Sequence, residues 1–377
     1  MRAYYFLLIA LGFHAVAGQT EKPAAPAGAI EFLRAGIAAQ QHGDNRSAIE
    51  SFRKALTLQP KMAEAHAALG EALAAIGQLD EAIDQDLQAL AIAPDKTAVR
   101  MNLATAYFKK NDLANAREQG EALHTAAPSD VAAAVLLGSV YIKMGREAEA
   151  VDLLTPMEQG RESNMELEYV LGFSLIQLGR DKEGVPRMEK VAQARHSASA
   201  YVVAGASLLH NGKMVGARAD LDAAMSLDPT IPGLATMAGQ ARYAMKDMAA
   251  SRAAFQVALR ANPADPTANL DLGAIRLAEG DYENARPLLE LALQLQPKLP
   301  LARMEMAKLD AVTGRYAEAA ATLEDLVKAE PNWVDAHWEL ASVYTELNRP
   351  ADGRRERMIA QELRAKAQDA SKDHNTP

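Results

Sequence analysis

The stretch AIESFRKALTLQP at residues 48–60 returns as SRAAFQVALRANP at residues 251–263. In both, a small residue is followed by Phe four places on, by Ala seven places on and by Pro twelve places on. Prolines recur every 34 residues in two sets, namely Pro60, Pro94 and Pro128, then Pro229, Pro263, Pro297 and Pro331. The two sets lie 101 residues apart, one residue short of three periods. A fixed period of this length indicates a chain built from stacked repeats.

Two columns of the repeat contain only small residues. Alignment on the period gives ten repeats, which start at residues 29, 63, 97, 131, 165, 198, 232, 266, 300 and 334. Position 8 holds Gly or Ala in every repeat, and position 20 holds Ala, Gly or Ser. Glycine inside a helix costs about 0.5–1 kcal/mol relative to alanine. Its recurrence therefore predicts that two helices approach closely at these positions.

Each repeat reads as a pair of helices. In repeat 8, apolar residues recur at three- and four-residue steps and are interrupted at EGDYENA. Gly280 is suited to end the first helix and Asp281 to cap the second, and Gly43 and Asp44 repeat this pairing. The proline at position 32 ends the second helix, because proline cannot continue it.

The spacing resembles the tetratricopeptide repeat family. The shared pattern is Gly or Ala at position 8, Tyr or Leu at 11, Ala at 20, a large apolar residue at 24, Ala at 27 and Pro at 32. Tyr107, Tyr141 and Tyr344 match position 11, and Phe52 and Phe255 match position 24. The resemblance implies an all-α fold, an α-solenoid of about ten stacked helix-turn-helix repeats that forms a right-handed superhelix and a single elongated domain over residues 29–360.

Several repeats depart from this pattern. Asp86 and Gly120 replace the large residue at position 24, and Pro156 and Pro186 fall within predicted second helices. An interior proline kinks or breaks a helix, so we expect the stack to be least regular around residues 150–200. In repeat 10 the second helix turns polar, which predicts a capping helix followed by a polar C-terminal tail at 361–377.

The N-terminal residues follow the secretory pattern. Residues 1–17 combine Arg2, a short apolar run and the small-residue site AVA, which predicts a signal peptide, with an uncleaved anchor as the alternative. Residues 18–28 are rich in Pro, Ala and Gly and read as a flexible linker. The chain has no cysteine, so a lipoprotein anchor, disulfides and thiolate sites are excluded. We therefore expect a periplasmic or secreted protein.

No motif in the chain indicates catalysis. Metalloprotease, phosphate-loop and dinucleotide-binding motifs are absent, and Ser207 and His210 lie on one predicted helix without a nucleophile elbow. His66 and His337 share position 4 and read as core or groove-edge residues. The net charge of −9 argues against nucleic-acid binding. We expect no enzyme activity, no cofactor and no metal.

The candidate binding surface is an apolar stripe on the first helices. In the family, positions 2, 5, 9 and 12 line an inner groove. Here these positions hold Met101, Phe108, Val135, Ile142, Tyr169, Phe173, Ile176, Val202, Leu209, Tyr243, Leu270 and Leu277. An exposed apolar patch rimmed by charge marks an interaction site, but tight coiling could instead bury these residues as core.

The sequence thus predicts a non-catalytic, exported scaffold that binds a protein or peptide partner through this groove. The alternative is an accessory ligand- or glycan-binding subunit of an envelope or polysaccharide-export enzyme complex. Self-association through the end repeats, with Trp333 and Trp338 as anchors, is a third possibility.

Overall fold

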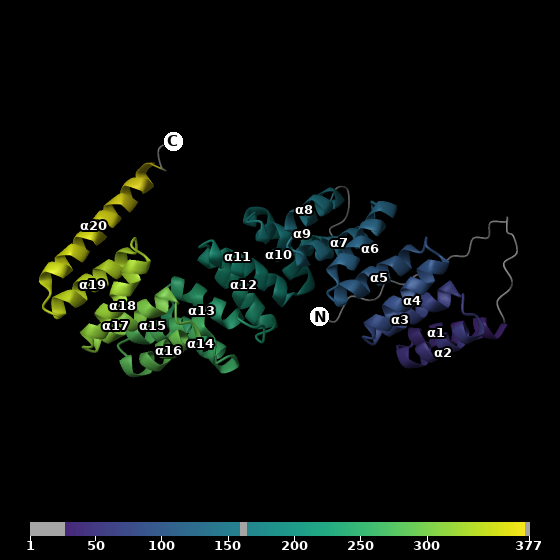
Figure 1. The fold of residues 1–377 in the computed structure, drawn as a ribbon, viewed down its shortest axis with the longest axis horizontal. Helices are drawn as coiled ribbons and strands as arrows, with labels where there is room; N and C mark the ends of the chain where they lie inside the picture. Colours follow the sequence, from purple (N-terminus) through teal and green to yellow (C-terminus); the bar gives the residue numbers. More distant parts are fainter. Residues whose placement is uncertain (1–26, 159–163, 374–377) are drawn as a thin grey trace. The chain divides into compact units, whose positions relative to one another are not determined.

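The computed structural model describes residues 27–158 and 164–373, and there it contains twenty α-helices, one short 3-10 helix and no strand (Figure 1). The helices pair into ten hairpins, called repeats 1 to 10. Their bounds are α1 Ala27–Gln41, α2 Asn45–Leu58, α3 Ala63–Ala75, α4 Leu79–Ile92, α5 Thr97–Lys109, α6 Leu113–Ala126, α7 Val131–Lys143, α8 Glu147–Leu154, η1 Thr155–Glu158, α9 Met165–Gln177, α10 Asp181–Arg195, α11 Ala198–His210, α12 Met214–Leu227, α13 Leu234–Ala244, α14 Met248–Ala261, α15 Pro266–Ala278, α16 Tyr282–Leu295, α17 Pro300–Val312, α18 Tyr316–Ala329, α19 Val334–Glu346 and α20 Pro350–Asp373.

The observed helix starts follow the 34-residue period of the sequence. The first helices of repeats 2 to 6 and 8 to 10 begin at the residues predicted from the 34-residue period. Side chains just before several of these helices accept hydrogen bonds from backbone N–H groups of the first turn, which satisfies donors that the helix leaves unpaired. These capping residues are Asp130, Asn164, Ser197 and Asp265.

The prediction for the turns inside the hairpins is confirmed in part. Gly43 and Gly280 have φ angles of +79° and +78°, a left-handed conformation that glycine adopts without strain. Asp44 caps α2 by accepting from the Ser47 N–H at 3.1 Å. Asp281 makes no such cap, because its carboxylate accepts from the side chains of Arg276 and Asn284 instead.

The chain divides into two compact units between Met157 and Glu158. The N-terminal body contains repeats 1 to 4, and the C-terminal body contains repeats 5 to 10. Within each body, the second helix of a repeat packs against its own first helix and, where the body contains a following repeat, against the first helix of that repeat. The predicted right-handed superhelix and single elongated domain concern the arrangement of the two bodies, and both stay predictions.

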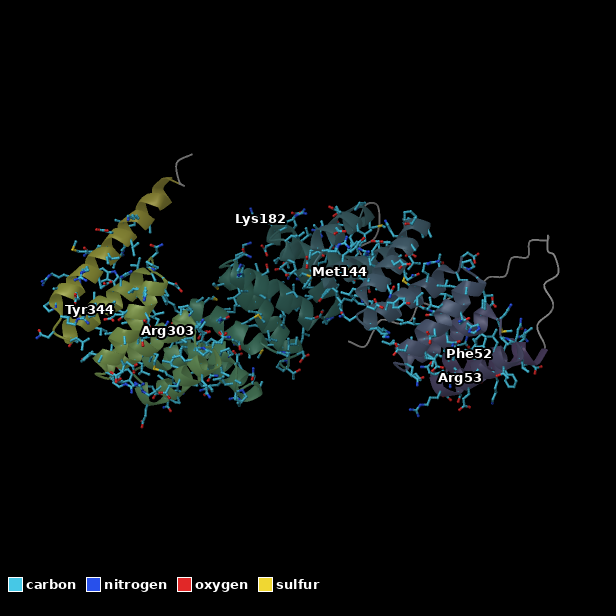
Figure 2. All side chains as sticks on the ribbon, viewed as in Figure 1. Phe52, Arg53, Met144, Lys182, Arg303 and Tyr344 are labelled. Atoms are coloured by element: carbon cyan, nitrogen blue, oxygen red, sulfur yellow. The ribbon has the colours of Figure 1, made fainter. Side chains whose placement is uncertain are left out.

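The small residues at positions 8 and 20 mark close helix contacts. A Cβ built on Gly36 would lie 2.4 Å from the ring of Phe52, and one on Gly205 would lie 2.8 Å from Leu221. Ala48 and Ala217, at position 20, are fully buried. Phe52 is also fully buried, whereas the adjacent Arg53 is exposed and pairs with Glu81 (Figure 2).

The two interior prolines of repeats 4 and 5 have different effects. α8 is only 8 residues long and gives way to η1, which contains Pro156, so the second helix of repeat 4 is broken as predicted. Pro186 lies inside α10, which continues unbroken for 15 residues. Pro186 is exposed, and so is Pro287 at the same position of α16. Proline has no backbone N–H, so the carbonyl four residues earlier lacks its helical donor. At an exposed position this carbonyl can accept a hydrogen bond from water instead.

The two ends of the chain differ in what the structure describes. The predicted signal peptide lies outside the described residues, as does nearly all of the predicted linker. The predicted tail at 361–377 starts inside α20, which extends to Asp373, so the boundary predicted at residue 360 is not a structural one. No helix in the described ranges is both long and apolar enough to cross a membrane.

Position 4 joins consecutive repeats through hydrogen bonds. His66 and His337 each use Nε2 to bond, at 2.9 Å, the carbonyl of the proline six residues earlier. Arg100 and Asn269 occupy the same position and donate to Pro94 and Pro263 in the same way. Because a carbonyl only accepts, the histidine Nε2 must hold the proton. The position-4 histidines therefore join consecutive repeats by hydrogen bonds, with His337 buried and His66 half-buried.

Asp86 occupies a position where other repeats place a large apolar side chain. It is 1% exposed, and its Oδ1 has no hydrogen-bond partner. A Cβ added to Gly70 would lie 2.5 Å from this oxygen. Burial, with a smaller contribution from the Glu71 carboxylate, raises the pKa of Asp86 to about 8.

Candidate partner-binding surfaces

In the N-terminal body, the predicted groove residues lie on α5 and α7. Met101 and Phe108 of α5 and Val135 and Ile142 of α7 are all half-buried. The Lys143 ammonium lies 4.7 Å from the centroid of the Phe108 ring, a distance at which a cation is attracted to an aromatic face. These side chains are neither core nor fully open surface.

In the C-terminal body, most of the predicted residues form one partly exposed row. Tyr169, Phe173 and Ile176 of α9 and Val202 and Leu209 of α11 are half-buried and pack against the core of repeats 5 to 7. That core includes Met188, Leu221 and Leu234.

The remaining predicted residues separate into surface and core. Tyr243 of α13 is 44% exposed. Leu270 of α15 is only 5% exposed and packs with Leu289 and Leu309, so it belongs to the core and not to a groove. Leu277 is half-buried against the same cluster. The apolar row that can face a partner therefore extends from α9 to α13.

Beyond α13 the first helices present half-buried polar groups. The Gln240 amide donates to Asp271 over 3.2 Å, and burial raises the pKa of Asp271 to about 6. Glu305 accepts from Lys308 at 2.8 Å. Burial likewise raises the pKa of Glu339 above its usual range.

The sequence did not lead us to predict these three carboxylates as part of a surface. Asp271, Glu305 and Glu339 all occupy position 6 of consecutive repeats, so they recur every 34 residues. The recurrence at position 6 is visible in the sequence, but position 6 is not among the family's groove positions, which are 2, 5, 9 and 12. The structure thus places an acidic surface on α15, α17 and α19.

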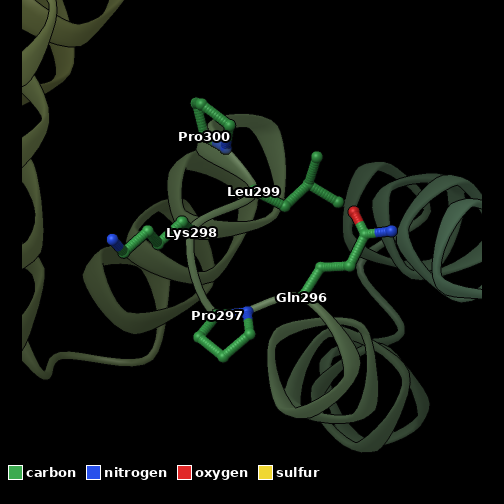
Figure 3. A pocket seen from close by; sticks show the side chains of 5 residues that line it. All are labelled: Gln296, Pro297, Lys298, Leu299 and Pro300. Atoms are coloured by element: carbon green, nitrogen blue, oxygen red, sulfur yellow. The ribbon is translucent and has the colours of Figure 1, made fainter.

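Two pockets lie at turns between repeats of the C-terminal body. The first has a volume of about 510 Å³ and is lined by residues 296–300, and the Gln296 and Leu299 side chains extend toward the same space (Figure 3). The second, about 680 Å³, is lined by residues 299–301 and 330–333 and includes the predicted anchor Trp333. Trp338 is half-buried on α19 and lines neither pocket. Neither pocket includes Tyr169, Phe173 or Tyr243.

The residues considered for chemistry have structural roles. Ser207 is buried and donates to the Asp181 carboxylate, while His210 is exposed one turn later. Within residues 27–158 and 164–373, no group of three or more His, Asp or Glu side chains is placed to hold a metal ion.

Comparisons with known proteins agree with this geometry. A family model described as tetratricopeptide repeat matches residues 33–97, 101–155 and 236–300, and a second model with the same description matches residues 276–344. These segments cover more than half of the chain. A search of curated proteins found no match.

Similar solved structures have low sequence identity to this chain. A tetratricopeptide repeat protein from Parabacteroides merdae is 17% identical, with 71% of this chain and 100% of that chain covered and a TM-score of 0.52. MamA from Desulfovibrio magneticus, residues 41 to the end, is 18% identical, with 46% and 98% covered and a TM-score of 0.43. Because tetratricopeptide repeat models match more than half of the chain, the chain belongs to the tetratricopeptide repeat family.

Proposed function

We propose that this chain is a non-catalytic scaffold, exported to the periplasm or cell envelope, that binds a protein or peptide partner through its first helices. Proteins of this family bind protein partners, which supports the general class of function. The observation that favours binding in the C-terminal body is the apolar row on α9, α11 and α13. Export rests on the secretory pattern of residues 1–17.

The row has the properties of a peptide-binding surface. Its aromatic members Tyr169 and Phe173 are half-buried, so the core holds them in place while part of each side chain is accessible. Tyr243 adds a more exposed aromatic ring on α13. Aromatic side chains lose little conformational entropy on binding and are frequent at the centre of interfaces. An extended or helical apolar segment is the partner that this row would bind best.

A pull-down of the mature protein from its own cell envelope tests this proposal. Tyr243→Glu should remove the main partner, because it introduces a charge into the row at a position exposed enough to leave the fold intact. Tyr169→Glu and Phe173→Glu should act in the same direction, provided that circular dichroism shows a native helix content.

The matched control is Tyr282→Glu. Tyr282 lies on the second helix α16, outside the row, and is similarly exposed at 39%. The control should retain the partner. A set of partners that is unchanged in the Tyr243, Tyr169 and Phe173 variants would refute binding through this row.

A further inference from the structure

Arginines at position 21 connect consecutive repeats of the C-terminal body. They recur as Arg218, Arg252 and Arg286, each 34 residues after the last. Arg252 of α14 donates to Glu279 at 2.7 Å, and Arg286 of α16 donates to Asp310 at 3.0 Å. In each case the carboxylate belongs to the following repeat.

Arg218 makes the same kind of contact at longer range. Its Nη1 lies 3.5 Å from Asp247, which precedes α14 in the following repeat. In all three repeats the acceptor lies at or just after the C-terminal end of the next first helix. Arg218 also pairs with Asp222 of its own helix, and Arg117, the one arginine at this position in the described N-terminal body, pairs with Glu121 of its own helix.

The last repeat has this arginine but no following repeat in the described chain. Arg354 of α20 occupies position 21, and Arg357 and Arg364 follow at three- and ten-residue steps. All three are exposed, and none forms an ion pair within the described residues. With Gln361 they form the arginine stripe, which extends about 15 Å along α20 at 1.5 Å per residue.

No carboxylate neutralises this stripe from its own helix. At about 100° per residue, the four side chains fall within roughly 80° of one another around α20. Glu356 lies about 80–160° from the four side chains, where it bonds Nδ1 of His337 at 2.6 Å. Glu362 lies about 80° around the helix from Arg354, and about 140° and 160° from Arg357 and Arg364.

Arg354 and Arg357 lie at positions where the preceding second helix, α18, contacts the next repeat. In α18 the equivalent residues are Ala320 and Leu323, which share a buried cluster with Leu340 and Val343 of α19. In α20 the same positions are Arg354 and Arg357. Figure 1 shows that α20 continues well past α19 toward the C-terminus. The face is therefore placed to receive a helix, and at position 24 it carries Arg357 where α18 has the apolar Leu323.

We propose that the arginine stripe of α20 is a docking surface for an acidic helix of a partner protein, which packs where the first helix of a following repeat would pack. The earlier repeats show the expected contact, a carboxylate near the C-terminal end of the incoming helix paired with the position-21 arginine. Arg357, in place of an apolar residue, and Arg364 favour additional carboxylates along that helix. This surface is separate from the apolar row on α9, α11 and α13.

Fluorescence anisotropy with a synthetic probe tests the proposal on the full mature chain. The probe is a labelled 17-residue alanine-based helix with glutamates along one face, and its control has glutamines at the same places. We expect the glutamate probe to bind at low salt, and Arg354→Glu with Arg357→Glu to weaken binding at least tenfold. Arg34→Glu with Arg260→Glu is the matched control, because both residues are exposed helix arginines without an ion pair among the described residues. It should leave binding unchanged.

Three results would overturn the proposal. The first is equal binding by the Arg354 and Arg357 variant and the control variant, and the second is equal binding of the glutamine probe. The third is sedimentation velocity that shows self-association of the wild type, abolished by Arg354→Glu, since a second copy of the chain would then be the occupant. Retained native helix content in every variant makes each result interpretable.

Discussion

The ring of Phe255 lies directly against the Cα of Gly239, so that a Cβ on residue 239 would be 2.6 Å from the ring. Phe52 and Gly36 have the same relationship 203 residues earlier, with a corresponding distance of 2.4 Å. The two similar stretches at 48–60 and 251–263 therefore share a packing contact. Phe at position 24 fills the space that glycine leaves at position 8.

Gly239→Ala should lower the stability of repeat 7. Alanine favours a helix by about 0.5–1 kcal/mol over glycine, but overpacking a buried contact costs about 1–3 kcal/mol. Because Phe255 is fully buried and cannot move aside freely, we expect a net loss of about 1–2 kcal/mol. Thermal unfolding followed by circular dichroism measures it.

Gly216→Ala is the control for this substitution. Gly216 lies in α12, and its nearest neighbour is the flexible end of Leu208, 3.1 Å from the added Cβ. This variant should be as stable as the wild type or slightly more stable. Equal melting temperatures of the two variants would contradict the packing argument.

Local patterns predicted the repeats well, because a period of 34 and small residues in two columns report on contacts between neighbouring helices. Effects that depend on solvent exposure were harder to predict. Pro156 and Pro186 look alike in the sequence, yet only Pro156 coincides with a break, and α10 absorbs Pro186 on its exposed side. Leu270 fits the groove pattern but is buried by Leu289 and Leu309, which lie in two other helices. The position-21 arginines were visible in the sequence, but their carboxylate partners vary in position, from Asp247 to Glu279 to Asp310.

His337→Phe should destabilise the last repeat by about 1–3 kcal/mol, the cost of leaving buried polar groups unpaired. The substitution keeps an aromatic ring but removes the bonds to the Pro331 carbonyl and to Glu356. His337→Asn should recover part of the loss, since Asn269 makes the carbonyl contact at the same position of repeat 8. Hydrogen exchange of α19 amides measures both variants. If the Phe variant were as protected as the wild type, the position-4 bond would contribute nothing.

Pro287→Ala should stabilise α16. Proline in a helix interior is about 3 kcal/mol less favourable than alanine, and the freer unfolded chain of the alanine variant offsets about 0.4–1 kcal/mol. We expect a gain of about 2–2.6 kcal/mol, measured by denaturant unfolding. Pro300→Ala is the control, because the first residue of α17 needs no backbone donor. The control should lose about 0.4–1 kcal/mol, because its unfolded chain is freer, and the prediction fails if Pro287→Ala is no more stable than this control.

Asp86→Leu should stabilise repeat 2, increasingly so as the pH rises. Since the pKa of Asp86 is about 8 in the folded chain and ordinarily 3.8, the folded state binds the proton more tightly than the unfolded state. Wild-type stability therefore falls as the pH rises from about 4 to 8. Leucine removes this loss and supplies the apolar side chain that Leu221 and Leu289 provide against Gly205 and Gly273.

The measurement is hydrogen exchange of α3 and α4 amides at pH 5 and pH 8, corrected for the intrinsic exchange rate. We expect the variant to exceed the wild type by about 1–3 kcal/mol at pH 8 and by less at pH 5. Asp84→Leu is the control on the exposed side of α4, and it should show no such pH-dependent gain. An advantage of Asp86→Leu that is equal at both pH values would mean that apolar packing, and not the buried charge, accounts for it. No advantage at pH 8 would mean that the Asp86 carboxyl is solvated as it ionises.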